Sequence, residues 1–169
     1  MKKILINGLI ALACAGCSSC IPEFAFLHSG PRTLDVLAKS FSAAPDKANI
    51  YVIEVRQCSG FAEERCVVFL DGTEVGEMRG GCYRFFRRPP KEHSIGVGWC
   101  GWIETAVVLT AEAGENYFVL FTEHASAGKH WWQPGEHWYT VEIVGEDEGR
   151  NLVLKSTLAG KTRGLRYSE

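Results

Sequence analysis

The stretch CYRFFRRPPKEHSIGVGWC, residues 82–100, decides the fold predicted for this chain. Its two halves alternate in polarity on either side of a turn at Pro89–His93, which predicts an antiparallel hairpin. In that register the apolar face pairs Arg87 with Ile95, Phe85 with Val97 and Tyr83 with Trp99. The opposite face is basic and rich in glycine, and at its far end Cys82 lies next to Cys100.

Two further hairpins flank this one. Asp71-Gly72 predicts a two-residue type I′ turn, because both positions need positive φ and these residues tolerate it. Leu70 and Thr73 would flank the turn, which places Val68 opposite Val75. The apolar segments 105–109 and 117–121 predict a third hairpin near the centre of the sheet.

The remaining elements complete a mainly β fold. Strands are predicted at 48–56 and 139–144, and short helices at 33–41 and 146–155, the first capped by Thr33. We therefore expect a small antiparallel β-sandwich of about seven strands, with short helical segments before and after it. The predicted organisation is a leader at 1–16, a tether with the short helix at 17–45, the sandwich at 46–158 and a loose tail at 159–169.

Composition excludes some classes of protein. Of the 169 residues 46% are hydrophobic and 22% charged, as in a globular domain rather than a disordered chain. The net charge is −2, and becomes −4 once the leader with Lys2 and Lys3 is removed. A nucleic-acid partner is not expected, because such binders need a basic face to displace counterions.

The N-terminus is typical of an exported lipoprotein. Lys2 and Lys3 precede a short apolar run, which is typical of a signal peptide and too short to span a membrane. The following ALACAGCSSC resembles the lipobox of bacterial lipoproteins, in which small residues precede an acylated cysteine. Cys17 is favoured as the lipidated residue, with Cys14 as the alternative. We expect a cell-envelope location, anchored to the periplasmic side of the outer membrane, with the membrane as a partner through the N-terminal lipid.

Export changes the interpretation of the other cysteines. Cys58, Cys66, Cys82 and Cys100 are an even number in an oxidising compartment, which predicts a disulfide scaffold. Four cysteines allow three pairings. The hairpin register favours Cys82–Cys100 and leaves Cys58–Cys66.

The middle of the chain resembles a known family. The segments KANIYVIEVR, VVFLDGTEVGEM, PPKEHSIGVG and LTAEAGENYFVLF occur in the order seen in the DUF2846-like family of bacterial lipoproteins, over about residues 46–154. The resemblance implies a transthyretin-like or PEGA-like β-sandwich on an envelope lipoprotein. It implies no activity, because none is established for that family.

The most suggestive candidate binding segment is EHASAGKHWWQPGEHWY, residues 123–139. Its aromatic and imidazole side chains are Trp131, Trp132, Trp138, His124, His130 and His137. Tryptophan rings could stack on an envelope glycan, and gathered histidines could bind a metal, although their spacing matches no helix or strand face. The simplest interpretation is that the loop caps one end of the sandwich, with no metal and no cofactor.

The sequence contains no motif that indicates catalysis. The chain lacks a GxSxG elbow, an HExxH motif and a phosphate-binding loop. Arg79, Arg84, Arg87 and Arg88 form a local basic group, interpreted as a solvated strand face rather than as an anion site. The sequence thus predicts a non-catalytic binding or structural module of the envelope with a glycan or protein partner. The alternative is a carbohydrate- or metal-binding protein that uses residues 124–139.

Overall fold

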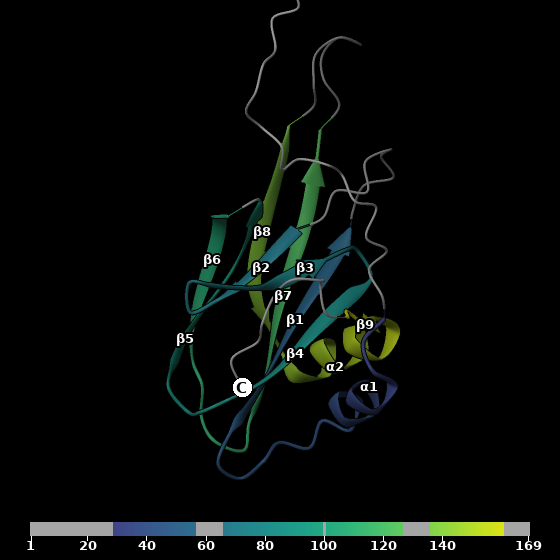
Figure 1. The fold of residues 1–169 in the computed structure, drawn as a ribbon, viewed down its shortest axis with the longest axis vertical. Coiled ribbons are helices and arrows are strands. Elements are labelled where there is room, and N and C mark those ends of the chain that lie inside the picture. The colour runs from purple at the N-terminus through teal and green to yellow at the C-terminus, as the bar shows by residue number, and fades with distance from the viewer. Residues whose placement is uncertain (1–28, 57–65, 100, 127–135, 161–169) are drawn as a thin grey trace, which may run out of the picture.

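The computed structural model describes residues 29–56, 66–99, 101–126 and 136–160 (Figure 1). The elements in chain order are α1 (Arg32–Lys39), β1 (Ala48–Arg56), β2 (Cys66–Leu70), β3 (Thr73–Met78), β4 (Cys82–Arg88), β5 (Glu92–Trp99), β6 (Trp102–Thr110), β7 (Asn116–Ala125), β8 (His137–Val144), α2 (Glu146–Lys155) and β9 (Thr157–Leu158). Strands dominate, as the alternating sequence predicts.

The strands form two sheets that pack face to face, so the predicted β-sandwich is confirmed. One sheet has five strands in the order β8-β7-β1-β4-β9, and the other has four in the order β3-β2-β5-β6. Both helices lie against the outer face of the five-stranded sheet (Figure 1). The molecule is therefore built in three layers: helices, five-stranded sheet and four-stranded sheet.

The main core lies between the two sheets. Alternate residues of each strand point inward, so that Ile50 and Val52 of β1 meet Val68 of β2 and Ile95 and Val97 of β5, all with no exposed surface. Burial of a side chain of this size contributes about 1.5–3 kcal/mol. This core holds the two sheets together.

A second core lies between the five-stranded sheet and the helices. Tyr51, Tyr83 and Phe118 are buried there, and the rings of Tyr51 and Phe118 stack with centroids 4.8 Å apart. The Tyr51 hydroxyl donates a hydrogen bond to the Ala38 carbonyl at 2.8 Å, which ties α1 to β1. The helix before the sandwich is thus packed on the sheet.

The first predicted hairpin is confirmed with one change in register. Asp71 and Gly72 have φ of 52° and 75°, as a type I′ turn requires, and Leu70 pairs with Thr73. Beyond Phe69 the register shifts, so that Val68 faces Gly76 instead of Val75. Val75 is the additional residue of this bulge, and its side chain packs into the main core.

The second and third predicted hairpins are wrong. β4 pairs with β1 and β9, whereas β5 pairs with β2 and β6, and β6 and β7 likewise lie in different sheets. The physical reason is that β4 has large apolar side chains to bury on both faces: Tyr83 packs under the helices and Phe86 packs between the sheets. Pro89 and Pro90 lack N–H donors and carry the chain from one sheet to the other.

The sandwich is mixed rather than purely antiparallel. β1 runs parallel to β7, with Val52 opposite Val119, and β9 runs parallel to β4. Parallel neighbours need a long connection between them, and residues 57–115 provide it for β1 and β7.

Several predicted elements are confirmed. β1 spans 48–56 and α2 spans 146–155, as predicted, and α1 covers most of the predicted helix. The expected Thr33 cap is wrong, because α1 begins at Arg32 after Pro31, which makes no side-chain capping bond. The segment 124–138 is partly strand: β7 continues to Ala125 and β8 begins at His137.

The sandwich is closed at the β3–β4 side by an arginine. Arg84 is 4% exposed, and its Nη2 donates to the Glu77 carbonyl of β3 at 2.6 Å and to the Gly160 carbonyl at 3.3 Å. Gly76 leaves room for this guanidinium, which a Cβ at that position would meet. The expected solvated basic face is therefore wrong for Arg84, whose side chain lies inside the sandwich.

Candidate functional site

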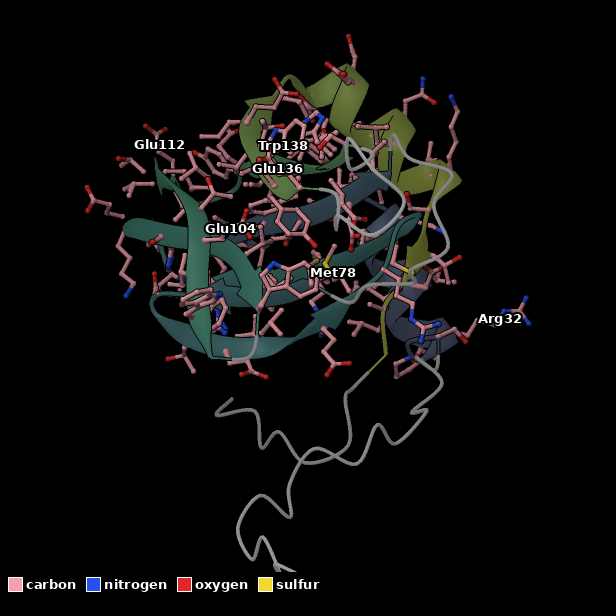
Figure 2. All side chains as sticks on the ribbon, turned by 90° about the horizontal axis from the view of Figure 1, so that it is seen from above. Arg32, Met78, Glu104, Glu112, Glu136 and Trp138 are labelled. Atoms are coloured by element: carbon pink, nitrogen blue, oxygen red, sulfur yellow. The ribbon has the colours of Figure 1, made fainter. Side chains whose placement is uncertain are left out.

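One end of the sandwich collects most of the residues with functional chemistry. β1, β3, β5 and β7 end there, and β2, β4, β6 and β8 begin there, as the pairing registers require. We call it the loop end; it is the upper end in Figure 1, and Figure 2 looks down on it with Glu104, Glu136 and Trp138 labelled.

A buried acid–thiol pair joins the two sheets at the loop end. Glu54 of β1 and Cys66 of β2 both have no exposed surface, and the Cys66 Sγ donates to Glu54 Oε2 at 3.1 Å. Burial, and then the Glu54 carboxylate, raise the pKa of the Cys66 thiol well above its ordinary value. A protonated thiol is a poor nucleophile, so this pair acts as a structural contact between the sheets.

A second carboxylate joins β6 to β8 on the β6–β8 side of the sandwich. Glu104 Oε2 accepts a hydrogen bond from Trp99 Nε1 at 3.0 Å, and its Oε1 accepts one from the Tyr139 backbone N–H at 3.3 Å. The rings of Trp99 and Tyr139 lie 5.9 Å apart. Burial, and then the nearby Glu123 carboxylate, raise the pKa of Tyr139 above its ordinary value.

The outer face of β7 and β8 carries an exposed aromatic ring. His124 and Trp138 are directly opposite each other, with ring centroids 5.2 Å apart and planes inclined by 13°. His124 Nε2 also lies 2.9 Å from Thr140 Oγ1. Trp138 keeps 42% of its surface exposed despite this stacking.

Only one cysteine of each predicted disulfide lies within the described residues. Cys66 and Cys82 carry free thiols in the structure, and their expected partners Cys58 and Cys100 lie outside the described residues. The register argument for Cys82–Cys100 is wrong, since β4 and β5 lie in different sheets. Burial, and then the Glu54 charge, raise the pKa of Cys82 as well.

The predicted ligand residues of 124–139 are not gathered into one described cluster. His130, Trp131 and Trp132 lie outside the described residues, as do the lipidation candidates Cys14 and Cys17. His137 begins β8, but its side chain is not described. Within the described ranges, no three His, Cys, Asp or Glu side chains are grouped as a metal site would require.

A groove of about 330 Å³ lies between α1 and β9, far from the aromatic face. It is lined by Ser29, Gly30, Arg32, Asp35, Lys39, Thr157 and Leu158. Two of its three charged side chains are paired with each other: Lys39 Nζ lies 3.2 Å from Asp35, and the Tyr83 hydroxyl donates to the same carboxylate at 2.7 Å. This groove is therefore a weaker candidate than the β7–β8 face.

Sequence reasoning missed the acidic residues of the loop end. The predicted strand 48–56 carries no assigned role for Glu54, yet the Glu54 side chain is buried against Cys66 of the other sheet. Glu104 lies just outside the predicted strand segment 105–109, and Thr140 and Glu142 lie in the predicted strand 139–144 without an assigned role. One signal is present in the sequence: Glu54 interrupts the run 50–55, whose other residues are aliphatic or aromatic.

No family model matches the chain, and no curated protein matches it.

Proposed function

We propose that this chain is an exported, lipid-anchored envelope protein whose β-sandwich acts as a non-catalytic binding or structural module. The observation that carries the proposal is the leader: a short apolar run followed by small residues and Cys17, with Cys14 as the alternative acceptor. Two or more acyl chains, at about 0.8 kcal/mol per buried CH₂, would anchor such a protein stably. No helix in the described ranges is long and apolar enough to cross a membrane.

The chemistry of the loop end supports binding rather than reaction. The Cys66 thiol is held protonated against Glu54, and Glu104 is engaged by Trp99 and the β8 backbone. These groups act in contacts that join strands. A surface built from a rigid pair of sheets suits recognition of an envelope glycan or protein.

Carbohydrate binding is the second candidate function, and one observation favours it. Trp138 is 42% exposed on the outer face of β8, and exposed aromatic rings suit stacking on sugars. Metal binding by the histidines of 124–139 would need His130, which lies outside the described residues.

The anchor is tested by expressing the full chain in a bacterial host and measuring its partitioning and N-terminal mass. We expect the protein in the membrane fraction, with a mature N-terminus at Cys17 that carries acyl chains. Cys17→Ser should release it or leave the leader uncut, whereas Cys14→Ser should change neither result. An unacylated mature protein in the soluble fraction would overturn the proposal, and acylation at Cys14 would move the site.

A further inference from the structure

The outer face of β7 and β8 beyond the helices forms a small platform. The cross-strand pairs on this face are His124 with Trp138, Thr122 with Thr140, and Leu120 with Glu142. Trp138, Thr140 and Glu142 are all exposed and follow one another along β8 at steps of roughly 6.5–7 Å. We call Trp138, Thr140, Glu142 and His124 the β8 platform.

The platform is organised before any ligand arrives. One face of the Trp138 indole packs on the His124 imidazole, and the His124 ring is oriented by Thr140 Oγ1 at 2.9 Å. Because the ring is already packed on one side, binding on its other side loses little side-chain entropy. Whichever of His124 and Thr140 donates their hydrogen bond, the Thr140 hydroxyl keeps a lone pair for a ligand hydroxyl.

The charge of the surrounding strands selects against anionic ligands. Residues 116–126 and 136–144 contain Glu123, Glu136 and Glu142 and no lysine or arginine. Glu123 is buried on the inner face of β7, so a phosphate or an anionic lipid on the platform would meet the exposed carboxylates of Glu136 and Glu142 and no lysine or arginine of these two strands. A carboxylate such as Glu142 instead accepts hydrogen bonds from neutral hydroxyl groups.

We propose that the β8 platform binds a neutral glycan chain, with a pyranose ring on the free face of Trp138 and hydroxyls bonded to Thr140 and Glu142. The inference rests on the proposed function and names the ligand class of the module. It places the glycan on the sheet face of β8. A cationic ligand fits less well, because cation recognition uses several aromatic walls around the charge, whereas the platform offers one indole backed by an imidazole.

The test is calorimetric titration of the full chain with chitotetraose, an uncharged β-linked N-acetylglucosamine oligomer. We expect saturable binding with a Kd on the order of 1 mM or tighter. Trp138→Ala should weaken it by about tenfold or more, because a stacking aromatic is removed. Glu142→Gln should weaken it by about threefold, because the amide is a poorer acceptor.

Trp102→Ala is the matched control, since Trp102 on β6 is 69% exposed and lies outside the platform. It should leave the Kd within about twofold, and thermal melts should show each variant folded. Absence of saturable binding at roughly 10 mM sugar would overturn the inference. The inference would also be overturned if the protein bound tetramethylammonium but no sugar, and if this binding were lost in Trp138→Ala. Either result leaves the acylation and membrane fractionation of the proposed function untouched.

Discussion

At the scale of single residues, a buried histidine joins two turns at the end opposite the loop end. His93 is 1% exposed; its Nδ1 lies 2.9 Å from Asp71 Oδ2 and its Nε2 lies 3.0 Å from the Pro89 carbonyl. Asp71 Oδ1 also accepts a hydrogen bond from the Ser94 N–H at 3.1 Å. Burial acts to raise the pKa of Asp71, but the hydrogen bonds from His93 and Ser94 outweigh it and lower that pKa below its ordinary value.

This lowered pKa predicts a pH-dependent effect of Asp71→Asn. A carboxyl whose pKa is lower in the folded state stabilises above its unfolded pKa of about 3.9, and this contribution is lost as the pH falls through the folded pKa. We expect the variant to lose about 0.5–1 kcal/mol at pH 6, a modest value because the Asp71 side chain is 37% exposed. Urea unfolding at several pH values should show this gap closing below about pH 4.

Asp46→Asn makes the same charge change at an exposed site and should show no such closing gap. A gap for Asp71→Asn that stays constant from pH 6 to pH 3 would contradict the prediction.

At the scale of elements, α2 docks on the five-stranded sheet through a glycine. Gly149 is buried, and a Cβ at that position would overlap the Phe118 ring. The lack of a side chain therefore lets the helix approach β7 closely. Glu146, Asp147 and Glu148 in its first turn match the positive end of the helix dipole.

Gly149→Ala should destabilise the protein although alanine is the better helix former. Alanine gains about 1 kcal/mol in helix propensity, but overpacking a buried contact costs about 1–3 kcal/mol, and Phe118 lies between two layers. We expect a net loss of about 1 kcal/mol in the free energy of unfolding, measured by urea denaturation. Asn151→Ala at an exposed position of α2 supplies the propensity gain alone and should stabilise slightly. If both variants were more stable than the parent protein, α2 would tolerate a wider separation from β7, which would contradict the prediction.

At the scale of the whole molecule, the two open sides of the sandwich are closed by different means. On one side Glu104 links β6 to the β8 backbone. On the other, Arg84 crosses from β4 to the Glu77 carbonyl and the Gly160 carbonyl. Buried backbone carbonyls at sheet edges need such donors, since an unpaired buried acceptor costs about 1–3 kcal/mol.

Gly76→Ala should disrupt the closure by Arg84. Gly76 has φ of +124°, and an added Cβ would meet the Arg84 guanidinium, so backbone strain and loss of the arginine contacts act together. We expect a loss of about 3 kcal/mol in the free energy of unfolding. Gly72→Ala, at φ +75° with open space around it, carries the backbone cost alone and should lose about 1 kcal/mol. Equal losses in the two variants would show that Arg84 moves aside without cost.

Local chemistry made part of the fold predictable. The Asp71-Gly72 turn, the strand 48–56 and the helix 146–155 depend on neighbouring residues, and the structure contains all three. Trp138 and His124 both belong to the predicted candidate site, although their stacking becomes visible only when β7 and β8 pair.

The sequence by itself determined the β class, the alternation of faces along each strand and the turn at Asp71. Only the tertiary structure decided which strands are neighbours: the alternation in β4 and β5 is compatible with a hairpin, yet each strand lies in a different sheet. The physical reason is that alternation specifies which side chains share a face. The choice of neighbour depends on long-range burial, which here covers β4 on both faces and brings Glu54 onto Cys66.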